Sequence, residues 1–284
     1  MKKLLVFTLV LGYLIPVYGA ESKYKEEAIN LTIGDINLKV EAKRTSVDGS
    51  TAGHYSVKNL FDGNKSTAWV TRYDKDMTLS DEGLLRIIFQ EPIYVRSMTI
   101  RNGYQKTAAL YSANQRIKKL SIEKVIVGGR TYPLDNTVTL KDDMDEQEVS
   151  LNEGWTKSIN LFKTKELIFN ATDVYSGTKY DDLCISELRI NFSNNIDYLP
   201  STTWKDLKKL IDTNKTRRNS DWSWGGLNEK GYKLFNDLLY YVLTGNKEAY
   251  LYFDSYLPEG AGDSAAMKTI YRPAVNESLK LSHK

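Results

Sequence analysis

The stretch RNGYQKTAALYSANQRIKKLSI, residues 101–122, gathers side chains that suit a ligand covered in hydroxyl groups. Its amide and charged groups supply hydrogen-bond donors and acceptors, and its tyrosines add ring faces. The candidates for ligand contact are Tyr104, Lys106, Tyr111 and Asn114, with Lys106 and Tyr104 placed first. The alternative is structural: Asn102-Gly103 forms a plain turn and Asn114 ties two loops together.

The stretch NLFDGNKSTAWVT, residues 59–71, places a turn before one of the chain's five tryptophans. Asp62 and Gly63 favour that turn, because an aspartate can bond the backbone two residues on and glycine tolerates positive φ. Trp69 then has two interpretations. Its indole can fill the core of the fold, or its face can stack on the aligned C–H bonds of a sugar ring.

A third stretch, VYSGTKYDDLCISELRI at residues 174–190, carries Tyr180 followed by carboxylates. Asp181 and Asp182 can hold a loop or accept hydrogen bonds from sugar hydroxyls. A structural calcium ion is a further alternative, although calcium takes roughly six to eight oxygens and these side chains supply only part of that number. Catalysis by the pair is disfavoured, because neighbours on a strand point to opposite faces.

Motifs that would indicate an enzyme are absent from the sequence. His54 and His283 are its only histidines, and no Gly-x-Ser-x-Gly motif is present. The sequence also lacks the His-Glu-x-x-His zinc motif, the P-loop and the dinucleotide fingerprint. We therefore expect no catalytic residues, no cofactor and no catalytic metal.

The first twenty residues are typical of a secretory signal peptide. Lys2 and Lys3 precede an apolar run that ends at Val17, and small residues follow it. The run is shorter than the roughly 18 residues that a membrane span needs. We expect a protein that is secreted or held in the periplasm or cell envelope, with no membrane span once the signal is removed.

The amino-acid composition disfavours one class of partner and excludes one means of stabilising the fold. The 39 lysines and arginines nearly balance the 36 aspartates and glutamates, and no long basic block is present, which disfavours a nucleic-acid partner. Cys184 is the single cysteine, so the chain cannot form an internal disulfide and must be held together by its core.

The elements that must position these residues change in kind along the chain. Residues 36–192 consist of short alternating or β-branched runs separated by turns, which predicts an antiparallel sandwich, with a tight hairpin at Gly128-Gly129. After Pro200 the apolar spacing becomes helical. The predicted helices begin at a capping box formed by Thr203 and Asp206, run over 227–245 and 247–256, and continue more weakly in the last twenty residues.

Taken together, the three quoted stretches resemble the NADase-type glycan-binding domain, which is known from the N-terminal translocation domain of secreted bacterial NAD glycohydrolases. The resemblance covers about residues 45–193, with three blocks in the family's order. It implies a discoidin-like, galactose-binding-like jelly roll. One departure is TRYDKDMTLSDEG at residues 71–83, which is longer and more charged than the Gly-rich segment usual in the family, so a loop beside the binding site is expected to differ in shape.

We therefore expect a mainly β protein, with an antiparallel jelly-roll sandwich followed by a small α-helical C-terminal module. The predicted divisions are a signal peptide at 1–20, a galactose-binding-like domain at 21–199 and a helical module of unknown role at 200–284. No family resemblance is identified for the helical module.

The resemblance implies a secreted, non-enzymatic protein that binds a glycan or glycoconjugate through loops at one end of the sandwich. Residues 200–284 have no room for a catalytic NAD glycohydrolase domain. One alternative is a protein-binding adaptor on the same scaffold, with a protein partner on the helical module. Another is an enzyme with its site in the C-terminal part or at the domain junction. The expected ligand-binding residues are Trp69, Tyr104, Lys106, Tyr111, Asn114, Tyr180, Asp181 and Asp182.

Overall fold

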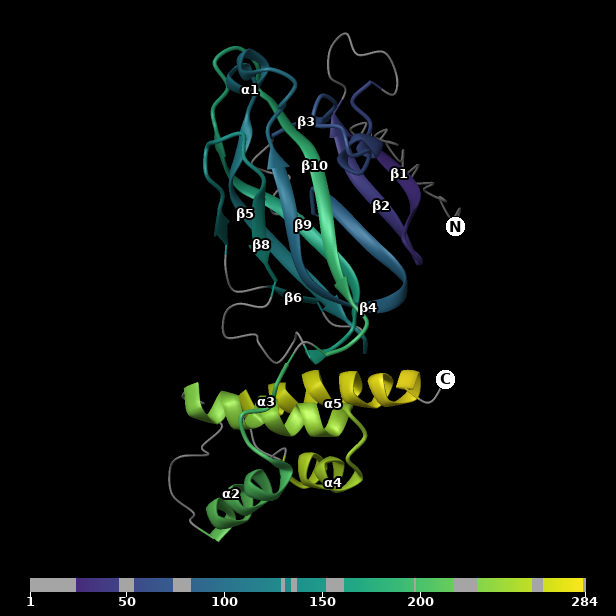
Figure 1. Cartoon of the computed structure of the whole chain (residues 1–284), viewed down its shortest axis with the longest axis vertical. Helices are drawn as coiled ribbons and strands as arrows, with labels where there is room; N and C mark the ends of the chain where they lie inside the picture. The colour runs from purple at the N-terminus through teal and green to yellow at the C-terminus, as the bar shows by residue number, and fades with distance from the viewer. Residues whose placement is uncertain are drawn as a thin grey trace, which may run out of the picture.

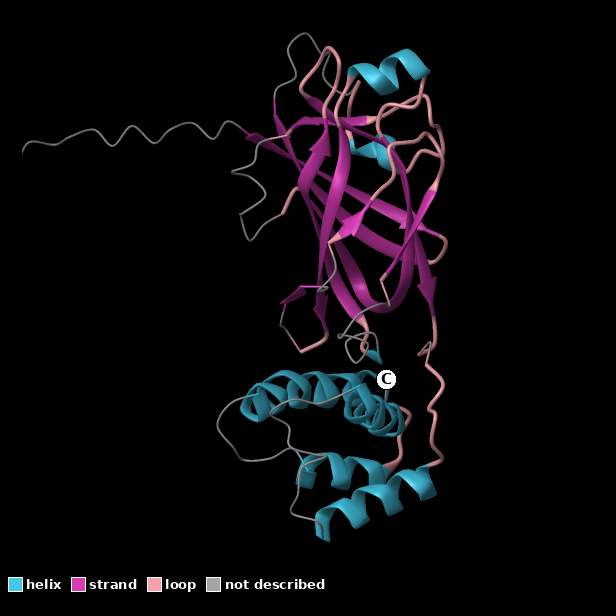
Figure 2. Cartoon of the chain, turned by 90° about the vertical axis from the view of Figure 1, so that its left-hand side faces the viewer, coloured by secondary structure: helices cyan, strands magenta, loops and turns pink. Residues whose placement is uncertain are grey.

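The computed structural model describes residues 24–45, 54–73, 83–128, 131–133, 137–151, 161–196, 198–216, 229–256 and 263–282. These residues form a β-sandwich with a group of helices at one end (Figure 1, Figure 2). The predicted fold class, a mainly β antiparallel jelly-roll sandwich followed by a helical module, is confirmed.

The strands pair in antiparallel fashion throughout. Their bounds are β1 Tyr24–Ile33, β2 Ile36–Thr45, β3 Trp69–Arg72, β4 Leu85–Asn102, β5 Arg116–Ile126, β6 Thr131–Pro133, β7 Val138–Thr139, β8 Gln147–Ser150, β9 Thr164–Tyr175 and β10 Asp182–Ser193. One layer has the order β1-β2-β4-β9-β5-β6, with β7 beside β5. The other is built from β3, β10, β4 and β8.

Strand β4 belongs to both layers. Its first half, from Leu85, pairs with β2 and β9, and its second half, up to Arg101, pairs with β10 and β8. The pairing with β9 shifts register between Ile88 and Ile93, a segment that contains Pro92, which cannot donate to a ladder. The strand therefore leaves one sheet at this point and enters the other, and it links the two faces of the sandwich.

Alternation along the strands fills the space between the layers. Trp69, Ile87, Met98 and Leu167 are buried there, each 0% exposed. Burying each large apolar side chain contributes about 1.5–3 kcal/mol relative to leaving it exposed. This sandwich core fixes the strands whose ends carry the loops.

Helices α2 to α5 follow the predicted order. Their bounds are η1 Val57–Leu60, α1 Ala108–Ala113, α2 Trp204–Thr216, α3 Glu229–Leu243, α4 Lys247–Tyr256 and α5 Asp263–Ser282. The predicted Thr203 cap is confirmed as a variant of the capping box, because the Thr203 hydroxyl accepts from the Asp206 amide at 3.3 Å and donates to the Asp206 carboxylate at 2.7 Å. Gly245, at φ +90°, ends α3, and the Asn246 side chain caps α4 by accepting from Ala249 at 3.0 Å.

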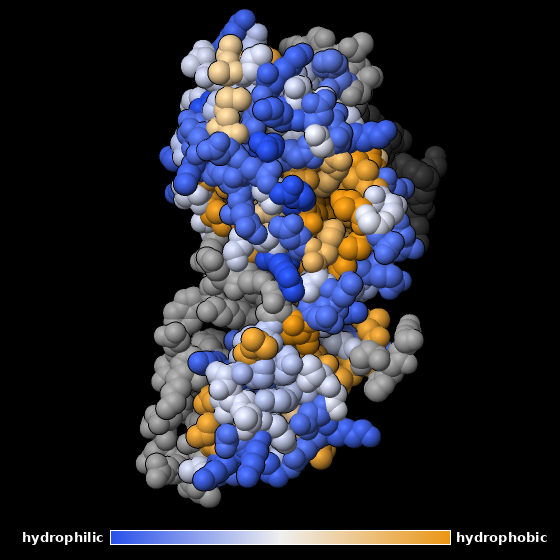
Figure 3. Space-filling view, viewed as in Figure 1, coloured by the Kyte–Doolittle hydropathy of each residue, from blue (hydrophilic) through white to orange (hydrophobic). Residues whose placement is uncertain are grey.

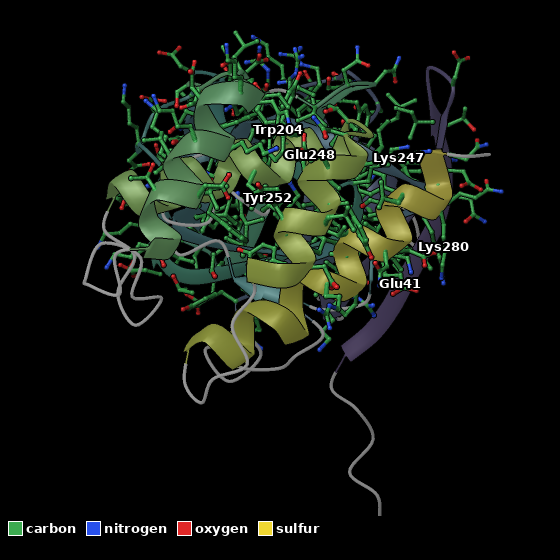
Figure 4. All side chains as sticks on the ribbon, turned by 90° about the horizontal axis from the view of Figure 1, so that it is seen from below. Glu41, Trp204, Lys247, Glu248, Tyr252 and Lys280 are labelled. Carbon is green, nitrogen blue, oxygen red and sulfur yellow. The ribbon has the colours of Figure 1, made fainter. Side chains whose placement is uncertain are left out.

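Helices α2 to α5 pack around a second core, which includes side chains from the sandwich. Phe235, Leu239 and Phe253 of the helices meet Ile126 and Phe162, which lie at the end of the sandwich nearest to the helices. On the far side, the Trp204 indole of α2 donates to Glu248 of α4 at 2.9 Å, and Tyr252 lies beside them (Figure 4). The helical module is thus built onto the sandwich, while its division from it at residues 199 and 200 stays a prediction.

Candidate functional site

The predicted binding loops lie at the end of the sandwich that is remote from helices α2 to α5 (Figure 1). Helix α1, which sequence periodicity did not predict, forms the centre of this loop end. Thr107 caps its first turn by accepting from Leu110 at 3.1 Å, and Asn114 closes the last turn by donating to the Leu110 carbonyl at 2.8 Å. The amides of Thr178 and Tyr180 then donate to the carbonyls of Ser112 and Ala113, at 3.0 Å and 2.9 Å. The β9–β10 loop is therefore fastened to α1.

Beneath α1, a buried arginine holds three segments together. Arg116 binds Asp142 through two nitrogens, at 2.9 Å and 2.7 Å, and also donates to the carbonyls of Asn114 and Ser176. The Tyr111 hydroxyl donates to the same Asp142 carboxylate at 3.0 Å. The pKa of Asp142 is lowered, chiefly by its hydrogen bond with Arg116, and the pKa of Tyr111 is raised, chiefly by burial. These charge-assisted bonds fix the shape of the loop end.

Two of the predicted ligand contacts therefore have structural roles. Tyr111 is 7% exposed and Asn114 is 5% exposed, and both are bonded within the loop end. The structure thus agrees with the alternative in which Asn114 has a structural role. Neither side chain is presented to solvent as a ligand contact, because each is needed to satisfy polar groups that the fold buries.

Trp69 fills the core. It lies in β3 opposite Ile185 of β10 and is 0% exposed, so the structure agrees with the interpretation as a core residue and contradicts the one in which its face stacks on a sugar. Its alternation with Val70 turns the indole towards the sandwich core and Val70 towards a second small cluster. The indole nitrogen has no hydrogen-bond partner within the described part of the chain.

Tyr104 is also buried, at 8% exposure. It packs in the small cluster with Ala68, Val70 and Cys184, and its ring lies edge-on to Tyr55 with centroids 6.3 Å apart. Burial is the main cause of the raised pKa of Tyr104. The prediction that Tyr104, together with Lys106, comes first among the ligand contacts is wrong for Tyr104, because this cluster covers its ring.

The remaining predicted contacts are more accessible. Lys106 and Asp181 are exposed, and Tyr180 is 41% exposed, with the Lys179 ammonium 4.9 Å from the centroid of its ring. Asp182 begins β10 opposite Arg72 and is half-buried. Of the eight predicted residues, three are thus exposed: Lys106, Tyr180 and Asp181.

The Asp62-Gly63 turn forms as predicted and is joined to β10. Asp62 accepts from the Asn64 amide at 2.8 Å and from the Thr67 hydroxyl at 2.7 Å. Gly63, at φ +71°, donates its amide to Glu187 at 3.2 Å. Burial is the main cause of the raised pKa of Glu187. Glu187 therefore serves this turn instead of meeting Asp181 and Asp182.

No metal cluster is found among the residues that the structure describes, in the sense of three or more grouped His, Cys, Asp or Glu side chains. The described side chains around His54 have structural roles. The Ser56 hydroxyl donates to Glu27, which also accepts from the Val57 amide at 3.1 Å. Ser56 thus joins β1 to the start of η1, and His54 packs its ring against Tyr55.

A hollow of about 640 Å³ lies beside the Asp62-Gly63 turn. It is lined by Ile33, Phe61, Gly63, Asn64, Lys65, Ser66, Thr99, Arg101, Glu146, Glu187, Leu188, Arg189 and Ile190. Sequence reasoning missed Arg101, Glu146 and Arg189 as candidate residues. The signal that could have found them is alternation, since Arg189 and Glu187 share one face of β10.

None of the helices that the structure describes is both long enough and apolar enough to cross a membrane.

Comparison with curated proteins finds no match. Among solved structures, the F5/8 type C domain of a Bacteroides fragilis protein is 9% identical, with a TM-score of 0.36, over 61% of this chain and 99% of that one.

Two further similar structures are carbohydrate-binding modules. GH31 CBM32-2 bound to GalNAc is 15% identical, with a TM-score of 0.36, over 55% of this chain and 97% of that one. The family 32 carbohydrate-binding module of Streptococcus pneumoniae EndoD is 10% identical, with a TM-score of 0.37, over 58% of this chain and 96% of that one.

The sequence also matches a protein family. Residues 34–191, more than half of the chain, match the NAD glycohydrolase translocation F5/8 type C domain. The match starts in the turn between β1 and β2 and ends in β10, so it covers the strands and loops described above. This chain therefore belongs to the family of NAD glycohydrolase translocation F5/8 type C domains.

Proposed function

We propose that this chain is an exported protein that binds a glycan through the loop end around α1 and catalyses no reaction on it. Membership of an F5/8 type C domain family supports a binding module. The arrangement of the loop end supports the location, since binding residues are commonly carried by loops on a rigid scaffold.

The observation that carries the proposal is the exposed ring of Tyr180. Unlike Trp69, Tyr104 and Tyr111, this aromatic side chain reaches solvent, on a loop that main-chain hydrogen bonds fasten to α1. An amphipathic ring held in this way can stack on the C–H face of a sugar and keep its hydroxyl in water. Because little conformational entropy remains to be lost, such a platform binds more favourably than a mobile one.

Lys106 and Asp181 would supply the polar part of the recognition. The lysine ammonium donates hydrogen bonds, and the aspartate carboxylate accepts them from hydroxyl groups. Both side chains are exposed, so each would exchange a contact with water for a contact with the ligand. The resulting affinity is expected to be low for a single sugar and higher for a multivalent glycan.

Export is proposed from the signal-like first twenty residues. The mass of the protein recovered outside the cytoplasm tests it: a mature N-terminus near residue 21 is expected, and an uncleaved chain that stays in the cytoplasm would contradict export. A protein partner on the helical module remains a separate prediction.

A glycan array probed with the full chain and with Tyr180→Ala and Lys106→Ala tests the binding proposal. Tyr250→Ala is the matched control, because Tyr250 is a partly exposed tyrosine of α4 in the helical module. Saturable binding that survives Tyr250→Ala and weakens about tenfold in Tyr180→Ala is expected. Equal binding by Tyr180→Ala and the control would contradict the loop end as the site, and a folded chain that binds no glycan would contradict the function.

A further inference from the structure

The hollow beside the Asp62-Gly63 turn lies away from α1, on the outer face of β4 and β10. Its floor is set by strand register, which places Arg101 opposite Glu187 and Thr99 opposite Arg189. Thr99 and Arg101 of β4 and Glu187 and Arg189 of β10 therefore share one face of the sheet. The volume of about 640 Å³ falls within the range of roughly 300–1,000 Å³ that is typical of small-ligand sites.

Two arginines of the floor retain hydrogen-bonding capacity. Glu146, from the segment before β8, bridges them: it binds Arg101 at 3.1 Å and Arg189 at 2.5 Å, each through a single guanidinium nitrogen. A guanidinium has five N–H donors, so within the described part of the chain most of them remain for a ligand. With Lys65 added, the lining carries three positive and two negative side chains, which leaves an excess of one positive charge.

The floor also holds an acceptor that lacks a donor. One carboxylate oxygen of Glu187 accepts from the Gly63 amide, while the other is buried without a hydrogen-bond partner within the described part of the chain. Leaving such an atom unsatisfied is costly, and a ligand hydroxyl that donates to it would remove the cost once the Glu187 side chain turns this oxygen towards the hollow.

Part of the lining is apolar. Phe61 and Ile33 line the hollow and are partly buried against the sandwich core. In Figure 3, hydrophobic side chains gather in a depression on this face of the sandwich, with hydrophilic ones around it. The hollow therefore combines an apolar wall, spare arginine donors and one acceptor in need of a hydroxyl.

We propose that this hollow binds a sugar acid, a hydroxyl-bearing ring that carries a carboxylate, as a second site separate from the loop end. The ligand carboxylate accepts from the free nitrogens of Arg101 and Arg189, a ring hydroxyl donates to Glu187, and the less polar ring face lies towards Phe61. Arginine and carboxylate suit each other in geometry as well as charge. A neutral sugar lacks the first contact, and a simple carboxylate lacks the other two.

Calorimetric titration of the full chain with D-glucuronate, D-glucose and acetate tests the inference. Saturable binding of D-glucuronate is expected, with D-glucose and acetate each at least about tenfold weaker. Arg101→Gln and Arg189→Gln should each weaken D-glucuronate binding by about tenfold. The Arg189 side chain is 62% exposed, so its variant is expected to fold, which a thermal melt checks.

Tyr180→Ala separates this site from the loop end. Unchanged D-glucuronate binding in Tyr180→Ala supports the hollow, and loss of binding there would place the ligand at the loop end and overturn the inference. So would equal binding by both arginine variants and the unaltered chain, or no saturable binding of D-glucuronate. Array binding that depends on Tyr180, together with no D-glucuronate binding, would refute the hollow alone and leave the proposed function standing.

Discussion

The sandwich core and the core of the helical module are completed in different ways. Residues from both layers of strands enclose Trp69 and Met98, so the sandwich supplies both sides of its own core. The helices instead surround a core that takes Ile126, Val127, Leu161 and Phe162 from the sandwich end. The sandwich core is therefore complete without the helices, while the helical core needs these four side chains of the sandwich end.

The two parts also meet at the level of the main chain. Gly128, in the turn after β5, has φ +92°, and a Cβ added there would lie 2.8 Å from the backbone nitrogen of Ala274 in α5. Of the predicted Gly128-Gly129 hairpin, Gly129 lies outside the described residues, and Gly128 lets the turn and α5 approach closely. This close contact indicates that the helical module is held in one position on the sandwich.

Phe162→Ala is the change that should separate the two cores most clearly. Phe162 is 0% exposed and packs against Tyr271 of α5, with ring centroids 5.9 Å apart. A buried phenylalanine replaced by alanine costs about 3–5 kcal/mol of unfolding free energy. Hydrogen exchange should rise in α3 and α5 while β4 and β10 stay protected.

Phe89→Ala is its matched control, because Phe89 of β4 is 4% exposed within the sandwich core. This variant should raise exchange in the strands as well as in the helices that depend on them. If Phe162→Ala loosens the strands as much as Phe89→Ala does, the two cores unfold as one unit and the comparison fails.

Lys124 offers a second test, since it lies where the cores meet. On one face of β5 it stands between Ile122, in the sandwich core, and Ile126, in the helical core. Burial lowers its pKa from 10.5 to about 7, so between these values the unfolded chain binds more protons than the folded chain. The cost of burying the charge is full below pH of about 7 and disappears above about 10.5, and stability therefore rises with pH across this window.

Lys124→Met should abolish that rise and stabilise the chain most near neutral pH. Urea unfolding at several pH values between these limits measures it. Lys119→Met is the control, because Lys119 lies exposed on the same strand. An identical pH dependence in Lys124→Met and Lys119→Met would show that Lys124 does not contribute it.

The smallest expected effect concerns the connector, which is the segment that follows β10 and leads from the sandwich to α2 of the helical module. Asp237 of α3 is 0% exposed and accepts from the Tyr198 hydroxyl and from the amide and hydroxyl of Ser201, the amide at 3.0 Å. Tyr198→Phe removes one of these bonds and should cost about 1–3 kcal/mol in urea unfolding. Tyr240→Phe, on a half-buried neighbouring ring, is the control. Equal stability of both variants would mean that the bond contributes nothing to holding the connector.

Prediction from the sequence was accurate where the cause is local. The helix from 247 to 256, the Thr203 cap and the Asp62-Gly63 turn depend on residues within a few positions of one another, and each was found as expected. Helix α1 was missed, because six residues are too few to show a helical period. The same limit hid the hollow, whose lining comes from several separate segments.

The candidate contacts show the same division. Residue type indicated that Tyr104, Tyr111 and Tyr180 could each meet a sugar, yet only Tyr180 is exposed. Tyr111 is held inside because its hydroxyl donates a hydrogen bond to Asp142, which lies 31 positions away in the sequence. Tyr104 is covered because Cys184 and Val70 pack against its ring. No pattern within one stretch specifies such partners.

The sequence by itself determined the kinds of element, their order and the class of fold, because hydrophobic period, caps and turns act between near neighbours. Only the tertiary structure decided which polar and aromatic side chains remain available for a ligand. Glu187 faces the Asp62-Gly63 turn across 124 positions of sequence, and Trp69 is covered by strands from both layers. Exposure and pairing depend on groups that folding alone brings together, and no local signal encodes them.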